Sequence, residues 1–363
     1  LYNRTILVYC PAVLGGAFLM IKAVDLFCGA GGLTHGLEKA GIEVVAGYDI
    51  EPTCRFAYEF NNNAAFVLKD VAEVTKEEIL GHFEGAEYTL LAGCAPCQPF
   101  SRYNSGKDVT KDQKWPLMYQ FSRLIREVLP DFVTMENVPD VVRHSVYDDF
   151  VVELQELGYN VWAEKVFCPD YGMPQLRKRH VLLASKLGEL DLLGRTHTPE
   201  NYCTVLDAIS DLPEIKAGET HASDALHRSA NLSPLNLERI RHSVPGGTWL
   251  DWPTNLRASC HKKSSGSTYR SVYARMRWDE PSPTMTTQCF GYGNGRFGHP
   301  EQDRAISLRE AAILQTFPRN YEFYPKNEEY KLVDIGRMIG NAVPVRLGEV
   351  IGESILRRVC YAL

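Results

Sequence analysis

The sequence predicts an α/β protein with a doubly wound, mostly parallel sheet and a second, smaller and irregular domain. Short apolar segments alternate with longer amphipathic ones over residues 21–185, a pattern typical of βαβ units. A glycine-rich turn follows the first apolar segment, as in sheets that bind a ligand at the carboxyl ends of their strands. After residue 185 the periodicity weakens and Gly, Pro, Ser, His and Arg become frequent, which indicates a different kind of region.

The predicted strands are short and rich in apolar residues, and they span residues 21–27, 43–49, 65–70, 88–93, 131–137, 160–167 and 179–185. Helices are predicted where apolar residues recur at helical spacing, over residues 33–41, 52–60, 75–82, 115–128, 145–157, 307–317 and 344–359. We therefore expect a first domain over residues 21–185, an inserted domain over 186–298, and a return to the first domain over 299–363, where the last helix packs back on it.

The amino terminus does not fit this pattern. Residues 6–20 form an apolar run of 15 residues, shorter than the about 20 residues that a membrane-spanning helix needs. No small-residue cleavage site follows, which disfavours a secretory signal. We expect residues 1–20 to be a non-native or disordered extension with Met20 as the natural start, which an intact mass of the native protein including Leu1 would contradict.

Composition narrows the class of protein. The 363 residues are 45% hydrophobic and 23% charged, which excludes a largely disordered chain or a coiled coil. The ten cysteines are scattered rather than arranged in a disulfide framework, and their spacing matches no zinc site. A reducing, cytoplasmic location is therefore expected, with no structural metal and no membrane association.

Three strand ends predict a nucleoside pocket. In DLFCGAGG (25–32), Gly29 and Gly31 allow a tight turn, although Thr34 stands where a dinucleotide fingerprint has its third glycine. Asp49 ends the second predicted strand and suits ribose hydroxyls, and Asp70 ends the third and suits a base amino group. Each could be a plain turn or a solvated loop acid when taken singly, but three consecutive strand ends favour the pocket.

The segment GCAPCQPFS (93–101) contains the only closely spaced cysteines, and two interpretations are open. Cys94 and Cys97 could form a redox pair, or Cys97 could be a single nucleophile on a turn stiffened by Pro96 and Pro99. A redox pair normally opens a helix, which Pro99 disfavours by restricting the residue before it. The nucleophile is therefore the preferred interpretation, with Cys94 as a buried thiol.

Two further motifs supply an acid and two cations. Glu136, in ENV (136–138), closes an apolar run, and a carboxyl group partly removed from water is a usable proton donor near neutral pH. QLRKRH (175–180) should place Arg177 and Arg179 on one face of an extended segment, where they suit phosphate or carbonyl groups. An ordinary strand-end acid and a solvated basic loop are the alternatives.

The order of these motifs resembles the DNA (cytosine-5)-methyltransferases of prokaryotic restriction–modification systems. DLFCGAGG, GCAPCQPFS, ENV and Q-x-R-x-R are followed by RMRWDEPSPTMTT (275–287), ISLREAAILQTFP (306–318) and GNAVP (340–344). The resemblance covers residues 21–363 and implies an S-adenosylmethionine-dependent methyltransferase fold, with residues 186–298 as the target-recognition domain.

The resemblance also implies roles for individual residues. The cofactor-binding residues would be Phe27, Gly29, Gly31, Asp49, Ile50, Asp70, Pro96 and Asn341. Cys97 would be the nucleophile, Glu136 the acid that binds cytosine, and Arg179 with Arg177 the contacts to the base carbonyl and nearby backbone. Ile50 departs from the bulky aromatic residue that often follows the ribose acid in this family, and it offers adenine less stacking area.

The implied reaction agrees with these residue types. A thiolate that adds to carbon 6 of cytosine raises the electron density at carbon 5, and Glu136 stabilises the adduct at ring nitrogen 3. The methyl group then passes from the sulfonium of S-adenosylmethionine to carbon 5. Because both faces of the ring must be reached, the cytosine has to leave the duplex stack. The polar segment 101–114 is expected to close over it.

The whole chain has a net charge of −6, which taken alone would argue against binding to nucleic acid. This value is an average that hides a basic segment. Residues 225–278 contain nine Lys and Arg against two acids, a local charge of +7, with interleaved Trp and Tyr. Such a stretch suits duplex DNA, although a solvated basic face is the common alternative. The DNA-contacting residues are expected to be Ser101, Arg241, Arg257, Lys262, Lys263, Arg270 and Arg275.

Other classes of function remain open at this stage. A transfer RNA cytosine-5 methyltransferase is disfavoured by the long middle region, and a non-catalytic DNA-binding regulator by intact Cys97, Glu136 and Arg179. A thiol oxidoreductase would need both Cys94 and Cys97. The expected partners are double-stranded DNA and a cognate restriction endonuclease acting on the same site, and the chain is expected to be a monomer.

Overall fold

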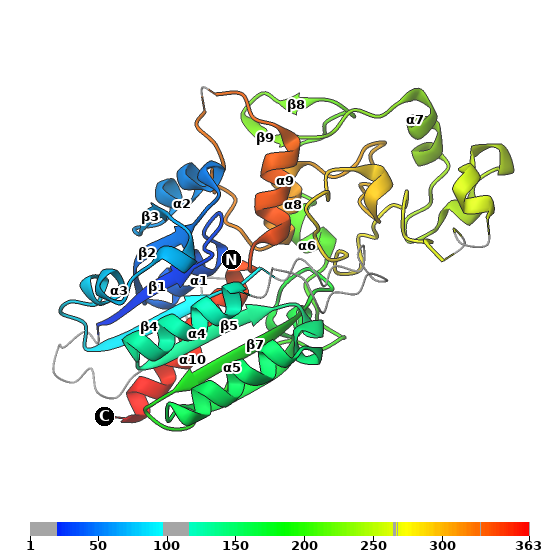
Figure 1. Ribbon diagram of the computed structural model, residues 1–363. Coiled ribbons are helices and arrows are strands. Elements are labelled where there is room, and N and C mark those ends of the chain that lie inside the picture. The colour runs from blue at the N-terminus through cyan, green and yellow to red at the C-terminus, as the bar shows by residue number, and fades with distance from the viewer. Residues whose placement is uncertain (1–19, 97–115, 264–265, 267, 327, 363) are drawn as a thin grey trace. The chain divides into compact units, whose positions relative to one another are not determined.

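The computed structural model describes residues 20–96, 116–263, 266, 268–326 and 328–362 (Figure 1). The predicted extension at residues 1–19 lies outside these residues. The chain divides into two compact units. The first unit comprises residues 1–166, 178–194 and 345–363, and the second comprises residues 167–177 and 195–344.

The first unit is built on one seven-stranded sheet, whose strand order is β3-β2-β1-β4-β5-β7-β6. The strands are β1 (Ile21–Leu26), β2 (Glu43–Asp49), β3 (Ala65–Leu68), β4 (Tyr88–Gly93), β5 (Phe132–Asn137), β6 (Asn160–Phe167) and β7 (Lys178–Ser185). The pairs β1–β2, β1–β4, β2–β3 and β4–β5 are parallel, whereas β5 and β7 are antiparallel. The predicted mostly parallel α/β fold is confirmed, and β1 and β4 stand where the chain changes its winding direction across the sheet.

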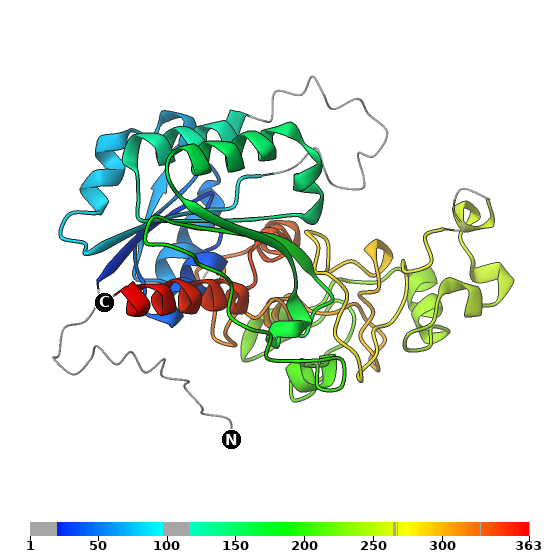
Figure 2. The ribbon, with the colours of Figure 1, turned by 90° about the horizontal axis from the view of Figure 1, so that it is seen from below.

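Helices cover both faces of this sheet. They are α1 (Gly32–Ala40), α2 (Arg55–Asn61), α3 (Lys76–His82), α4 (Pro116–Val128), α5 (Ser145–Glu156) and α10 (Val345–Ala362), with short 3₁₀ turns at Pro52–Cys54, Val71–Glu73 and Pro139–Arg143. Figure 2 shows α4 and α5 over one face and α1 and α10 over the other. The carboxyl-terminal helix α10 packs on α1, as predicted. The two helices lie so close at Gly36 that a Cβ atom added there would be 2.4 Å from the carbonyl oxygen of Val345.

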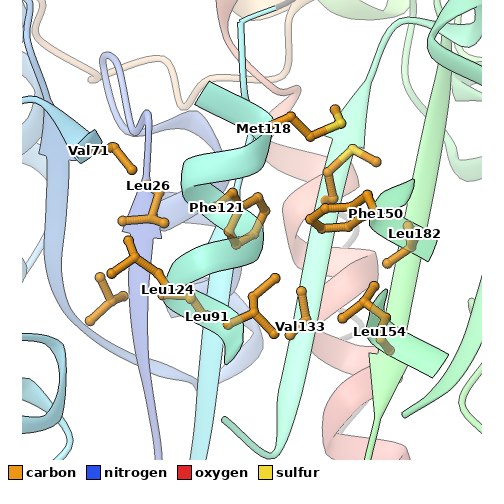
Figure 3. Close-up of a cluster of buried hydrophobic side chains, with 14 of the residues drawn as sticks. Leu26, Val71, Leu91, Met118, Phe121, Leu124, Val133, Phe150, Leu154 and Leu182 are labelled. Carbon is orange, nitrogen blue, oxygen red and sulfur yellow. The ribbon is translucent and has the colours of Figure 1, made fainter. Parts of the chain in front are cut away.

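The main core of the first unit lies between the sheet and α4 and α5 (Figure 3). Phe121 of α4 and Phe150 of α5 are fully or almost fully buried, with ring centroids 5.4 Å apart. Leu91 and Val133 of the central strands β4 and β5 are buried in the same cluster. Such burial stabilises each large side chain by about 1.5–3 kcal/mol, so the sheet holds the ends of its strands in fixed positions.

The second unit has little regular structure. Its elements are α6 (Val205–Ile209), β8 (Thr220–His221), β9 (Asp224–Arg228), α7 (Pro234–Arg241), α8 (Leu308–Leu314) and α9 (Leu332–Asn341), with 3₁₀ turns at Cys168–Tyr171, Trp249–Asp251, Thr254–Leu256, Ser259–Lys262 and Tyr292–Asn294. Trp249 and Trp252 anchor a small aromatic core that also contains Ile240, Leu256 and Tyr292. Large aromatic side chains let a short, irregular segment bury enough apolar area to fold.

The division of the chain differs from the predicted one at two places. Residues 299–344, predicted to return to the first domain, belong to the second unit, and the chain returns only at Val345. Residues 167–177 also belong to the second unit, although they precede the predicted boundary. Helices α6, α7 and α9 and the β8–β9 hairpin were not predicted. Among the helices that the structure describes, none is long and apolar enough to cross a membrane.

A buried charged group fixes α8 in the second unit. Arg304 and Glu310 are 0% and 1% exposed and form two hydrogen bonds of 2.7 Å. Burial alone would raise the pKa of Glu310, but the hydrogen bonds and charge of Arg304 outweigh it and lower the pKa to about 2. Beside them, burial lowers the pKa of His299 to about 4, and its Nδ1 accepts the N–H of Gln302 at 2.9 Å.

His299 predicts a loss of stability on mild acidification. Its pKa is lower in the folded chain than the ordinary value of 6.5, so the unfolded chain takes up the proton first. Stability is therefore complete above about pH 6.5 and falls as the pH drops toward 4, by about 2 kcal/mol at pH 5. Chemical denaturation at pH 7 and pH 5 should show this difference in the native chain and a smaller one in His299→Asn. Equal differences in the two chains would contradict the assignment.

Candidate active site

The glycine-rich turn after β1 is joined to the end of β2. Phe27 and Gly29 both have left-handed backbone conformations, with φ of 61° and 51°. The N–H of Gly29 donates to Oδ2 of Asp49 at 2.8 Å, and the N–H of Glu51 donates to Oδ1 at 2.9 Å. A Cβ atom on Gly29 would meet no atom of the described residues within 4 Å. A non-glycine residue at positive φ such as Phe27 is strained, and such strain is common at ligand sites.

The predicted cofactor residues of the first unit lie at one edge of the sheet. Asp49 ends β2 and Ile50 follows it, and Asp70 comes after β3, the direct neighbour of β2. The side chain of Ile50 is 66% exposed. Burial raises the pKa of Asp49, although its hydrogen bonds from backbone N–H groups oppose the shift. Oδ1 of Asp70 accepts the N–H of Ala72 at 2.9 Å. The strand order β3-β2-β1-β4 thus places these residues beside the Gly29 turn, an arrangement that fits a nucleoside.

Asp25 is a member of this region that the sequence motifs did not single out. It is 1% exposed, and Oδ2 accepts the hydroxyl of Thr34 at 2.7 Å. No hydrogen bond from a described residue reaches Oδ1. Burial raises the pKa of Asp25 to about 7. The sequence contained a signal for this residue, because Asp25 is an acid inside an apolar strand. Thr34, in place of a third glycine, can donate a hydrogen bond to it.

Glu136 lies at the carboxyl end of β5 and is 3% exposed. Its Oε2 accepts the thiol of Cys94 at 2.9 Å, and its Oε1 forms an ion pair of 2.6 Å with Nε of Arg179, although the N–H is not aligned for a hydrogen bond. The antiparallel register explains the ion pair. Glu136 stands opposite Val181 of β7, and Arg179 is two residues away on the same face of that strand.

The segment that leads to Cys97 is tied to β5. The side-chain amide of Asn137 donates to the carbonyl oxygen of Ala95 at 3.2 Å, and Pro96 is exposed. Cys97, Ser101 and the predicted closing segment 101–114 lie outside the described residues. The structure therefore describes the acid, the cation and the approach to the predicted nucleophile.

Arg177 does not share the setting of Arg179, which corrects the prediction that both lie on one face of an extended segment. It is 1% exposed and donates to the carbonyl oxygens of Met285, Gly340 and Ala342 at 3.0, 3.2 and 3.2 Å. The extended strand begins only at Lys178, so the alternation of faces does not extend back to Arg177. Arg177 belongs to the second unit and Arg179 to the first.

The predicted DNA-contacting residues also differ in exposure. Arg241, Lys262, Lys263 and Arg270 are exposed, and Arg257 is half-buried. Arg275 is 5% exposed and donates to the carbonyl oxygens of Ser243 and His299 at 3.0 and 2.9 Å. Its donors hold the backbone of the second unit together, and a contact of Arg275 with DNA stays a prediction. Within the described part of the chain, no group of three or more His, Cys, Asp or Glu could hold a metal ion.

The mostly parallel seven-stranded sheet with helices on both faces is the fold of a methyltransferase. The sequence profile of the C-5 cytosine-specific DNA methylases matches residues 21–357. The chain therefore belongs to the C-5 cytosine-specific DNA methylase family, and it is a DNA cytosine-5 methyltransferase. The predicted family and class of enzyme are confirmed.

Individual relatives support this assignment. The chain is 54% identical over 342 residues to the Type II methylase M.HgiDII of Herpetosiphon aurantiacus, covering 93% of this chain and 96% of the relative. It is 31% identical over 367 residues to the Type II methyltransferase M1.HphI of Haemophilus parahaemolyticus, covering 98% and 93%. Among solved structures, a prophage-encoded protein of E. coli has the same fold, with a TM-score of 0.72, 23% identity, and coverage of 93% of this chain and 99% of that one.

Cys94 predicts a graded effect on the rate of methyl transfer. Its thiol donates to Glu136, so Cys94→Val removes a hydrogen bond to the carboxyl group, whereas Cys94→Ser keeps a donor. We expect kcat to fall about tenfold in Cys94→Val, because hydrogen bonds to charged groups contribute about 1.5–3 kcal/mol. Cys94→Ser should retain nearly full activity. A loss in Cys94→Ser as large as in Cys94→Val would contradict the prediction.

Proposed function

We propose that this enzyme transfers a methyl group from S-adenosylmethionine to carbon 5 of a cytosine in a specific sequence of duplex DNA. The reaction proceeds through a covalent Cys97 adduct on a base that has left the duplex stack. The observation that carries the proposal is the buried Glu136, held by Cys94 and Arg179 at the end of β5. The order of the motifs around Cys97 and Glu136, shared with the family, supports the same assignment.

The residues at the edge of the sheet fit the cofactor. No described residue crowds Gly29, so a ligand can come close to the backbone there as far as the described residues are concerned. The carboxylates of Asp49 and Asp70 suit ribose hydroxyls and an adenine amino group. The exposed Ile50 offers an apolar surface for the adenine ring, and Phe27, Gly31, Pro96 and Asn341 complete the proposed set. The cofactor supplies an electrophilic methyl group on a sulfonium.

Cys97 and Glu136 divide the remaining chemistry between them. The thiolate of Cys97 forms a bond to carbon 6 of cytosine, and the electron pair of the double bond becomes available at carbon 5. Glu136 donates a hydrogen bond or a proton to ring nitrogen 3, which stabilises the adduct. Carbon 5 takes the methyl group, and S-adenosylhomocysteine is left. Water then accepts the proton of carbon 5, Cys97 leaves as a thiolate, and ring nitrogen 3 returns its proton to Glu136, which restores the ring. The proposed contact to the base carbonyl is Arg179, and its ion pair with Glu136 supports this role.

The second unit is the proposed target-recognition region. Exposed Arg241, Lys262, Lys263 and Arg270 suit the phosphates and base edges of duplex DNA, and Arg257 and Ser101 are further proposed contacts. Flipping one base out of the stack costs a few kcal/mol, which contacts to the surrounding duplex offset. The relatives are named Type II methylases and methyltransferases, so we propose a cognate restriction endonuclease acting on the same site, and a cytoplasmic monomer.

Transfer of an isotopically labelled methyl group tests this function. The purified chain should label duplex plasmid DNA, and digestion to nucleosides should recover the label in 5-methylcytosine. Transfer RNA offered at the same concentration should remain unlabelled. Label in transfer RNA alone would support the transfer RNA enzyme instead. DNA binding without any label would support a non-catalytic regulator.

A further inference from the structure

The guanidinium of Arg177 clamps one short piece of backbone in the second unit. Nη2 donates to the carbonyl oxygens of Gly340 and Ala342, both at 3.2 Å, and Nη1 donates to the carbonyl oxygen of Met285 at 3.0 Å. Gly340 and Ala342 are the two neighbours of Asn341 in the chain. A planar guanidinium presents its donors in a rigid fork, so it can hold several carbonyl groups in one fixed arrangement.

Two glutamines complete this clamp. The side-chain amide of Gln315 donates to the carbonyl oxygen of Ala342 at 2.7 Å. Gln175 donates to Oε1 of Gln315 at 2.5 Å and accepts the N–H of Met285 at 2.7 Å. Gln175, Arg177 and Gln315 are each 1% exposed or less, so no water competes for these hydrogen bonds.

Close packing holds the same piece of backbone from another side. A Cβ atom on Gly340 would lie 2.3 Å from the backbone of Thr286 and Thr287, a distance that no side chain tolerates. Gly340 and Asn341 are also the last residues of α9, where carbonyl groups lack partners within the helix. Arg177 satisfies the carbonyl group of Gly340 and that of Ala342, the residue that follows the helix. The negative end of the helix dipole also favours a cation at this position.

Asn341 itself is exposed, although the groups that hold its neighbours are buried. We propose that Arg177 is a positioning residue for the cofactor: it fixes the backbone on both sides of Asn341 and so presents that amide to S-adenosylmethionine. This inference rests on the proposed function, because it takes Asn341 as a cofactor-binding residue. A side chain fixed in its bound orientation loses less freedom on binding, which strengthens the affinity.

Titration of S-adenosylhomocysteine into the full chain, without DNA, tests the proposal. Asn341→Ala and Arg177→Met should each raise the Kd on the order of 10-fold, since misplacing a group by about 1 Å can cost as much as 100-fold. The double variant should bind no more weakly than the weaker single variant, because the two residues act through one contact. In a separate assay of methyl transfer, the KM for DNA of each of these variants should change less than about twofold.

Arg239→Met is the matched control, because Arg239 is also a buried arginine of the second unit and its Nε donates to a backbone carbonyl, that of Leu256. Its Kd for S-adenosylhomocysteine should equal that of the native chain. If Arg177→Met does not fold, Gln315→Met removes one of the two donors to Ala342 and should raise the Kd by a smaller factor. An unchanged Kd in the folded variant, or effects that multiply in the double variant, would overturn the proposal.

The outcome for Asn341→Ala separates this inference from the proposed function. If Asn341→Ala binds like the native chain while the native chain still methylates DNA, the positioning role is overturned and the function stands. If the native chain does not bind S-adenosylhomocysteine at all, the proposed function fails, and the positioning role fails with it.

Discussion

Replacing Cys97 by serine is expected to lower kcat for methyl transfer by at least about 10³-fold, because the reaction then lacks its attacking group. A serine hydroxyl stays protonated near neutral pH, whereas a thiol yields some of the far more nucleophilic thiolate. Binding of S-adenosylhomocysteine should not change, since the proposed cofactor residues are untouched. The measurement is single-turnover methyl transfer to duplex DNA under saturating cofactor.

Cys94→Ser is the matched control for this experiment. Cys94 and Cys97 lie three residues apart in one segment, and only Cys97 is the proposed nucleophile. The redox interpretation requires both thiols, so it predicts equal losses from the two substitutions. Near-native transfer by Cys94→Ser beside inactive Cys97→Ser would exclude it, and equal losses would contradict the role of Cys97 as the single nucleophile.

Glu136→Gln is expected to lower kcat on the order of 10²- to 10⁴-fold, the range that general acid catalysis contributes. The amide has nearly the same shape as the carboxyl group and can still accept a hydrogen bond from Cys94. It cannot supply a proton to ring nitrogen 3 of cytosine. Since the ion pair with Arg179 is also lost, the variant should melt at a slightly lower temperature.

Glu127→Gln on α4 provides the control. The carboxylate of Glu127 pairs with Arg123 at 2.9 Å, so this substitution also removes one ion pair from the first unit. It should leave kcat within about twofold of the native value, because a surface ion pair contributes only about 0–1 kcal/mol to stability. A Glu136→Gln variant as active as Glu127→Gln would contradict the role of Glu136 in the reaction.

The regular part of the fold follows directly from the sequence. The apolar runs that become β1, β2, β4 and β5 are bounded by turn residues, and their order with the intervening helices implies a parallel sheet. Asp49 and Glu136 could be placed because each closes an apolar run, and the end of a run is the end of a strand. In a parallel sheet such ends share one edge, so these residues could be grouped before their distances were known.

The parts that could not be predicted depend on tertiary contacts. Arg177 and Arg179 are both arginines of one motif, so the sequence does not distinguish their settings. The settings differ because the strand begins only at Lys178 and because carbonyl groups surround Arg177. Arg275 lies in a basic stretch, but its burial is set by residues 240–243 and 299–303, far away in sequence. The irregular second unit lacks a repeating pattern, so its boundary at Val345 could not be read from periodicity.

The central claim is that this chain methylates carbon 5 of cytosine within a specific duplex sequence. Bisulfite sequencing of plasmid DNA from cells that express the chain tests it most directly, with cells expressing Cys97→Ser as the reference. Cytosines resistant to conversion should occur at one position of one recurring sequence, and only with the native chain. Complete conversion of every cytosine in the plasmid, despite soluble native protein, would contradict the claim.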